Sequence, residues 1–285
     1  PHGIPISCEP GICASTAAQM DRYMCLWTAM GIESVNLLWA PRTYRHGENG
    51  AVGRLIEKKR EEIRAWGKME FPDAKIGVMR SVRNASRLGF SGGWNWDGTR
   101  GTLQETGRRG QLLDPADLIS GIADRYPVIL DAATELLTEE ELAGIERYVH
   151  NGGTFIALHV TGMHSPERAR SWPISRLTGL RPTTIQPLSN KITFLQDQKL
   201  WPSLCGKTID SHGFAFDYTG KNQTGNELAM QALARDVKVI AEWEDLPKQT
   251  GKIAVASRRI GKGRLIVLGS TFWRQARDSN GSWRH

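Results

Sequence analysis

Apolar residues recur along the chain at two spacings, and segments of the two kinds alternate. In residues 14–30 and 52–66 they recur every three or four positions, the period of a helix buried on one side. Residues 4–8 and 34–39 are short apolar runs, with the length and composition of buried strands. The order strand, helix, strand, helix predicts a parallel α/β unit whose helices cover the sheet.

This pattern breaks at the polar stretch GKMEFPD, where we place a domain boundary that divides the chain into residues 1–69 and 70–285. The second part begins with a predicted strand at residues 75–79. Residues 81–111 show no sustained periodicity and predict a long loop. A helix is predicted to start at DPAD, with Asp114 as N-cap and Pro115 at the first helical position.

Residues 126–159 predict one strand-helix-strand unit with a parallel sheet. The strands are expected at 127–130 and 154–158, and the helix between them starts at a capping box, TEEE, and stops at Asn151-Gly152. Further strands are expected at 191–195 and 237–243. A hairpin is expected from 252–257 and 264–268 around IGKG.

Composition and charge argue against two classes of binding partner, nucleic acids and membranes. Hydrophobic residues make up 40% of the chain, as in a globular protein, and no apolar run approaches the roughly 20 residues of a membrane span. The net charge is +7, but the basic residues are dispersed as short pairs and triplets and accompany no nucleic-acid motif. The four cysteines match no metal-binding spacing. We therefore expect neither a nucleic-acid nor a membrane partner, and no cofactor or metal.

The stretch PISCEPG offers the first candidate for chemistry. Parallel α/β architectures place their sites at the carboxyl ends of strands, where Glu9 would end one strand and Trp39 the next. A carboxylate beside an aromatic ring suits a sugar, as a nucleophile for the anomeric carbon and a face on which the ring stacks. Hydrogen-bonding side chains follow in the next loop: Arg42, Tyr44 and His46.

A structural interpretation of Glu9 stands beside the catalytic one. The acid would cap the helix that begins near Cys13, where the helix dipole favours a negative charge. Glycoside hydrolysis also needs a second carboxyl group, and neither Glu33 nor Glu48 is well placed, so we expect that partner upstream of Pro1. Residue type and position alone leave both interpretations open.

The second candidate is the turn after the strand at 154–158. In flavodoxin-like amidotransferases this elbow carries a nucleophilic cysteine, whereas here it would carry His159. With no cysteine within forty residues, we expect no amidotransferase chemistry. His159 and His164 are five residues apart and could be proposed as a metal pair. Because no third ligand is evident, hydrogen-bonded structural histidines are the favoured interpretation.

The run YPVILDAATELLTEEELAGIERYVHNGGTFIALHVTG resembles the amidotransferase-like middle domain of family 42 glycoside hydrolases, and IGKGRLIVLGSTFWR resembles the strand pair near the end of that domain. The resemblance covers about residues 75–274. Residues 1–69 in turn resemble the last two βα units of the (β/α)₈ barrel of the same clan. The implied fold is therefore α/β, the end of such a barrel followed by a flavodoxin-like three-layer domain.

In that family the nucleophile is a Glu at the end of strand seven, and a Trp that contacts substrate often ends strand eight. Glu9 and Trp39 match these positions, so the resemblance favours Glu9 as nucleophile. The family's acid/base Glu, which follows an Asn on strand four, has no counterpart in this sequence. The resemblance implies a retaining β-glycoside hydrolase of β-galactosidase type, a carbohydrate substrate, and a homo-oligomer, a trimer in the family. We expect this polypeptide by itself to be inactive.

Two other functions stay open at this stage. The first is a non-catalytic flavodoxin-like assembly or binding module, in which Glu9 has no role beyond stability. The second is a sugar-binding relative of the trehalose-utilisation proteins, whose core also ends a strand in a histidine-bearing turn; there, binding would depend on His159.

Overall fold

The computed structural model divides after Asp73 into two compact units, residues 1–73 and 74–285. In unit 1 it describes residues 7–8, 18, 21, 34–35, 50–51, 54–55 and 58. In unit 2 it describes residues 74–81, 83–84, 110–131, 134–185, 191–210, 214–216, 222–224, 228–244, 246 and 251–270.

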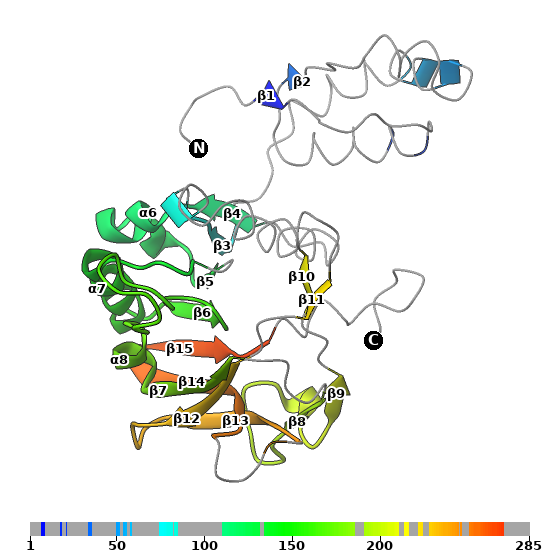
Figure 1. Ribbon diagram of the computed structural model, residues 1–285. Coiled ribbons are helices and arrows are strands. Elements are labelled where there is room, and N and C mark those ends of the chain that lie inside the picture. The colour runs from blue at the N-terminus through cyan, green and yellow to red at the C-terminus, as the bar shows by residue number, and fades with distance from the viewer. Residues whose placement is uncertain are drawn as a thin grey trace. The chain divides into compact units, whose positions relative to one another are not determined.

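Unit 1 contains a pair of parallel strands. Strand β1 (Ser7–Cys8) lies beside β2 (Ser34–Val35), with Ser7 opposite Ser34 and Cys8 opposite Val35 (Figure 1). The described positions in the two predicted helices are helical: Ala18, Asp21, Arg54, Leu55 and Lys58. Ala51, directly before the second predicted helix, is helical as well. The predicted parallel strand-helix-strand order is confirmed at these residues, while the remainder of a barrel is not shown.

Unit 2 is built on one mixed sheet of eleven strands. Five are parallel, in the spatial order β4 (Gly110–Leu113), β3 (Ile76–Met79), β5 (Val128–Asp131), β6 (Thr154–Leu158) and β15 (Gly263–Leu268). Numbered by their order along the chain, these strands run 2-1-3-4-5, which is the order of flavodoxin-like folds. The predicted flavodoxin-like α/β class is thus consistent with the parallel core of unit 2.

The sheet continues from β15 with antiparallel strands. These are β14 (Ile253–Ile260), β13 (Lys238–Trp243), β8 (Lys191–Phe194) and β9 (Thr208–Asp210). A branch of β12 (Leu228–Ala232) and β7 (Leu180–Ile185) joins at β14, and β10 (Phe214–Phe216) pairs separately with β11 (Asn222–Thr224). The expected strands at 191–195 and 237–243 and the expected hairpin are confirmed as β8, β13 and β14–β15.

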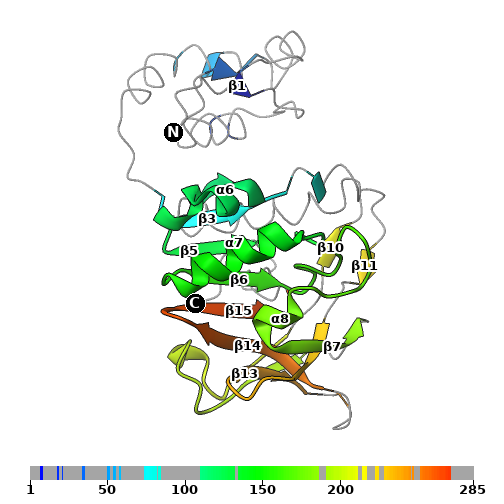
Figure 2. The same ribbon diagram turned by 90° about the vertical axis from the view of Figure 1, so that its left-hand side faces the viewer.

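The described helices of unit 2 are α6 (Pro115–Ser120), α7 (Glu139–His150) and the short α8 (Ser175–Thr178), with 3-10 turns η2 (Ile122–Arg125) and η3 (Pro202–Leu204). Within the described residues α6, α7 and α8 lie on one face of the sheet (Figure 2). Of the three layers expected from the sequence, the described residues therefore show two, the sheet and one layer of helices. None of the helices in the described ranges has the length and hydropathy to cross a membrane.

Both predicted helix starts are confirmed by full capping boxes. At α6 the Asp114 carboxylate accepts the Ala116 N–H at 3.1 Å, and the Asp117 carboxylate accepts the Asp114 N–H at 2.8 Å. At α7 Thr138 and Glu141 exchange the equivalent bonds, at 3.3 Å and 2.8 Å. These side chains satisfy N–H groups that the first helical turn leaves without partners.

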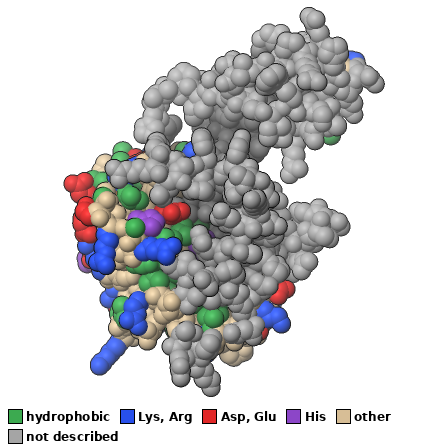
Figure 3. Space-filling model, viewed as in Figure 1, with side chains coloured by type: hydrophobic (Ala, Val, Ile, Leu, Met, Phe, Trp, Pro, Cys, Tyr) green, Lys and Arg blue, Asp and Glu red, His purple; other side chains and the backbone are tan. Residues whose placement is uncertain are grey.

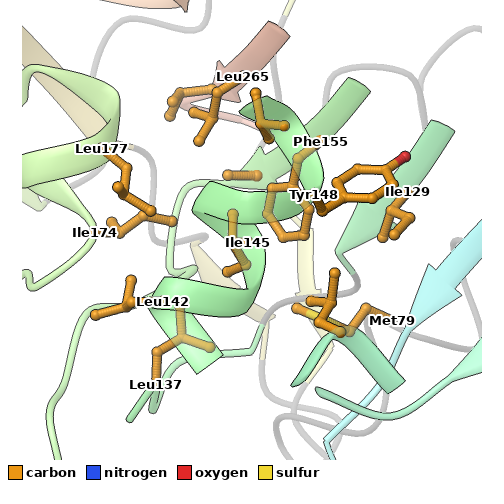
Figure 4. Packing of buried hydrophobic residues seen from close by; sticks show 14 of the residues in the cluster. Met79, Ile129, Leu137, Leu142, Ile145, Tyr148, Phe155, Ile174, Leu177 and Leu265 are labelled. Carbon is orange, nitrogen blue, oxygen red and sulfur yellow. The ribbon is translucent and has the colours of Figure 1, made fainter. Parts of the chain in front are cut away.

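Helix α7 anchors the main core. Leu142, Ile145 and Val149, the positions predicted to face inward, are fully buried against the sheet (Figure 4). Tyr148 lies on the same side, and its hydroxyl donates to the Tyr126 carbonyl at 2.7 Å. Burial raises the pKa of Tyr148, so the hydroxyl stays a donor throughout the neutral range. A second cluster fills the other face of the sheet and is centred on Trp243, Phe194 and Leu268.

Candidate functional site

The residues predicted to carry chemistry in unit 1 lie outside the described residues: Glu9, Trp39, Arg42, Tyr44 and His46. What the structure gives there is the parallel pairing of β1 with β2, and Glu9 is the next residue in sequence after β1. The geometry of this candidate site therefore stays a prediction. The described part of the chain offers a second edge of the same type, in unit 2.

Parallel strands in unit 2 end at a common edge, which is where open α/β sheets place their ligands. Along this edge β3 is followed by Arg80, β5 ends in Asp131, and β6 is followed by His159. The connection from β3 runs to β4 on one side, whereas β5 lies on its other side. The strand order thus reverses between β3 and β5, which is the position where open α/β sheets of this kind bind ligands.

Asp131 is completely buried at the end of β5. Its two oxygens accept the Thr134 hydroxyl at 2.6 Å and the Thr134 N–H at 2.9 Å. The carboxylate also accepts the Thr161 hydroxyl, whose oxygen in turn accepts the Leu158 N–H at 2.9 Å. Several donors compensate for the loss of water around the carboxylate. Asp131 therefore ties the turn after β5 to the turn after β6.

Asn84, which follows β3, is 4% exposed and makes a two-way link to the segment after β5. Its amide donates to the Leu136 carbonyl at 3.0 Å, and its amide oxygen accepts the Leu136 N–H at 2.8 Å. The Ser81 hydroxyl accepts the Asn84 N–H at 3.2 Å. Each of these groups is buried, so each bond removes the cost of an unpaired polar group.

Backbone pairing continues the connection between the segments that follow β5 and β6. The Gly162 N–H donates to the Thr134 carbonyl and the His164 N–H donates to the Glu135 carbonyl, both at 2.8 Å. The Leu137 N–H returns a bond to the His164 carbonyl at 3.1 Å. Together with Asn84 and Asp131, this short ladder joins the loops after β3, β5 and β6.

An ion pair lies beside this edge. Arg83 contacts both oxygens of Glu141 at 2.5 Å, and Glu141 is also the acid of the α7 capping box. The Glu141 side chain is 6% exposed, whereas that of Arg83 is 37% exposed. Since the carboxylate oxygens already accept from Arg83 and from the Thr138 N–H, Glu141 acts as a link between the β3 loop and α7.

The surroundings of His164 favour its neutral form. Its Nδ1 accepts the Arg170 N–H at 2.9 Å, so the neutral ring carries its hydrogen on Nε2, which lies 3.9 Å from a carboxylate oxygen of Glu135. Burial, and then the charge of Arg170, lower the pKa of His164, while burial raises the pKa of Glu135. His164 is thus a hydrogen-bonded structural histidine, as the sequence favoured.

His159 occupies the elbow after β6 with an ordinary backbone conformation, since the described non-glycine residues with positive φ are Arg170 and Trp172. A nucleophile elbow is instead strained. His159 lines a cavity of about 20 Å³, room for one water molecule, which also touches Trp172. Cys205, a free cysteine, donates its thiol to the Gln198 carbonyl between β8 and β9.

The polar side chains at this edge of unit 2 serve to hold the loops after β3, β5 and β6 together. Its buried carboxylates and amide are engaged within the protein, and the residues that the structure describes contain no group of three side chains able to hold a metal. Sequence reasoning passed over Asp131, Asn84 and Thr161. The available signal was a polar residue directly after an apolar strand run, as in VILD, the same criterion that selected Glu9.

Acidic and basic side chains are intermixed on the described surface seen in Figure 3, in line with the dispersed charge of the sequence.

Unit 2 is thus a mixed α/β domain whose parallel core is consistent with a flavodoxin-like fold. Solved structures share its fold at low sequence identity. Gan42B, a GH42 β-galactosidase from G. stearothermophilus, matches with a TM-score of 0.58 and 16% identity over 80% of this chain and 32% of its own. A cold-adapted β-galactosidase from Rahnella sp. R3 matches with a TM-score of 0.61 and 15% identity, over 79% and 33%.

An enzyme named for another sugar shares the fold as well. The α-L-fucosidase isoenzyme 2 from Paenibacillus thiaminolyticus matches with a TM-score of 0.55 and 15% identity, over 91% of this chain and 38% of its own. No protein-family model and no curated protein matches the sequence. The chain spans about a third of the length of the first of these solved proteins. The likeness is therefore one of fold, shared with glycoside hydrolases named for different sugars.

Proposed function

We propose that this chain serves in a retaining β-glycoside hydrolase, with the reactive carboxylate in unit 1 and a non-catalytic flavodoxin-like domain in unit 2. The observation that carries the proposal is the fold shared with solved glycoside hydrolases. It is supported by the parallel pair β1–β2, because Glu9 follows directly on the carboxyl end of β1. The engaged carboxylates of Asp131 and Glu141 at the edge of unit 2 support the non-catalytic role of that domain.

In this proposal the Glu9 carboxylate attacks the anomeric carbon, and the bond to the leaving oxygen breaks as an acid protonates that oxygen. Water then hydrolyses the resulting glycosyl ester and frees Glu9. Trp39 stacks on the apolar face of the sugar ring. Hydrogen bonds to the sugar come from Arg42, Tyr44 and His46. The substrate class is a β-linked carbohydrate, with a β-galactoside as the first candidate.

The test is Glu9→Gln, made in the protein as expressed from its natural reading frame and assayed with a panel of aryl β-glycosides. Turnover should fall by several orders of magnitude while the circular dichroism spectrum and Tm stay close to the parent, because the amide keeps the shape and loses the nucleophile. Glu33→Gln is the matched control, since Glu33 precedes its strand and should leave turnover unchanged.

A chemical rescue separates the nucleophile from other roles. With Glu9→Ala, added azide should restore turnover and yield a glycosyl azide of inverted anomeric configuration, because the anion enters the space left by the carboxylate. Full activity in Glu9→Gln would remove Glu9 from the mechanism. The alternative, a non-catalytic assembly or sugar-binding module, would then gain support if the purified protein hydrolysed none of the panel.

We also propose that unit 2 organises a homo-oligomer, with three subunits as the first expectation. The internal bonding of its loops suits a scaffold that has to keep its shape under contact with other subunits. Light scattering of the purified protein at several concentrations measures the oligomer number, and a monomer at all of them would contradict this part of the proposal.

A further inference from the structure

The loop between β6 and α8, residues 163–172, is closed by its own hydrogen bonds. Its two ends meet where the Trp172 N–H donates to the Met163 carbonyl at 3.1 Å. Inside it, the Ser165 N–H donates to the Arg168 carbonyl at 3.0 Å, and the Ser171 hydroxyl donates to the same carbonyl at 3.0 Å. The loop is therefore an ordered unit whose closure depends on a small set of bonds.

Two residues of this loop adopt an unfavourable backbone conformation. Arg170 has φ of 51° and Trp172 has φ of 49°, in the left-handed region that costs a residue with a side chain roughly 1–2 kcal/mol. Local contacts have to offset that cost. For Trp172 they include packing against both apolar clusters and the wall of the cavity beside His159. For Arg170 the described contact is the bond from its N–H to Nδ1 of His164.

We infer that His164 is an acid-sensitive latch on this loop: protonation of its Nδ1 removes the acceptor for the Arg170 N–H and releases residues 168–172. A protonated imidazole carries N–H groups at both nitrogens, so Nδ1 and the Arg170 amide would then present two donors to each other. The strained Arg170 and the neighbouring Trp172 relax to ordinary backbone conformations, and the side of the cavity formed by Trp172 opens. This inference does not depend on the proposed hydrolase.

The charged groups around the ring set the direction of the response. Among the described residues, Glu135 faces His164 from the segment after β5, and Arg170 faces it from the loop itself. Because the pKa of His164 is lowered on folding, the closed loop is favoured above about pH 6.5 and loses stability as the pH falls below that value. The pKa of Glu135 is raised on folding, so its ionisation weakens the closed state as the pH rises above 4.5, which is the opposite sign.

Three variants separate the acceptor from the titration. His164→Asn places an amide oxygen close to the position of Nδ1, keeps an acceptor for Arg170 and has no proton to gain in this range. His164→Gln reaches the position of Nε2 instead and removes the acceptor at every pH. Glu135→Gln keeps His164 and removes the facing negative charge, which favours the protonated imidazole, so the transition should remain and move to lower pH.

The experiment is hydrogen exchange of the full chain followed by mass spectrometry between pH 8 and pH 4.5, with protection factors corrected for the intrinsic rate. In the parent, protection of residues 168–172 should fall by up to tenfold per pH unit as the pH drops from about 6.5 towards the lowered pKa of His164 in the closed loop, while α7 stays protected. His164→Asn should hold its protection across the range, and His164→Gln should lack it throughout.

A parent chain whose loop protection stays constant from pH 8 to pH 4.5 would overturn the inference. The same holds if His164→Asn loses protection in parallel with the parent, because a residue without a titrating ring would then show the response. If His164→Gln does not fold, the comparison of the parent with His164→Asn decides the matter alone. Loss of protection in α7 at the same pH as in the loop would also contradict a local latch.

Discussion

Replacing Asp131 distinguishes a structural carboxylate from a catalytic one. In Asp131→Ala, the Thr134 N–H and the hydroxyls of Thr134 and Thr161 all lose their acceptor. A buried donor without a partner costs about 1–3 kcal/mol, but the two hydroxyls can turn to other acceptors, so we expect a total loss of about 3 kcal/mol. In a unit of about 200 residues this lowers Tm by about 6–12 °C.

Asp131→Asn should be much milder. The remaining oxygen still accepts from the Thr134 N–H and the Thr161 hydroxyl, while the new amide donates to the Thr134 hydroxyl, so the loss should be about 1 kcal/mol. Differential scanning calorimetry of the full chain measures both variants. The control is Asp197→Ala, an exposed acid between β8 and β9, which should change stability by less than about 0.5 kcal/mol.

The relative stability of Asp131→Asn and Asp131→Ala distinguishes a structural role of Asp131 from a catalytic one. A structural role predicts that stability follows the number of bonds kept, with Asn close to the parent. It also predicts that the proposed glycosidase turnover, assayed in the protein expressed from its natural reading frame, is unchanged in both variants. The reasoning fails if Asp131→Asn keeps its Tm and abolishes turnover, or if Asp131→Ala is as stable as the parent.

Two further substitutions test the packing of unit 2. Tyr148→Phe should cost about 1–2 kcal/mol in urea unfolding, because the buried Tyr126 carbonyl loses its donor, whereas Tyr126→Phe should cost less than about 0.5 kcal/mol. Gly263→Ala should lower the free energy of unfolding by about 3 kcal/mol, since the new Cβ would lie 2.1 Å from the Val149 carbonyl oxygen and 2.3 Å from that of Gly153. A variant as stable as the parent would show instead that β15 and α7 can move apart at no cost in stability.

Elements with several agreeing local signals were predictable from the sequence. Helix α7 has a capping box, inward apolar positions at helical spacing and a stop at Asn151-Gly152, and each signal was confirmed. The hairpin β14–β15 was predicted from its apolar runs and from IGKG, where Gly261 adopts φ of 57°. In both cases the information lies within about fifteen residues, so no distant contact was needed to recognise it.

Strands that exist because of a distant partner were missed. Strand β4, GQLL, lies at the end of a stretch without periodicity and is formed by pairing with β3. Strand β7 contains Pro182, which argues against a central strand, and among the described strands it lies at an edge, paired with β12. The candidate site in unit 2 was missed for the same reason, because the bonds from Asp131 to Thr161 and from Asn84 to Leu136 form only once separate loops are folded.

The place of β15 in the sheet has a consequence for synthesis on the ribosome. Strand β6 pairs on one side with β5, which precedes it closely, and on the other with β15, which follows roughly 100 residues later. At a translation rate of about 5–20 residues per second, the apolar edge of β6 waits about 5–20 s for its second neighbour. During that interval an exposed strand edge can pair with other nascent chains, so chaperone supply is expected to govern the yield of this protein.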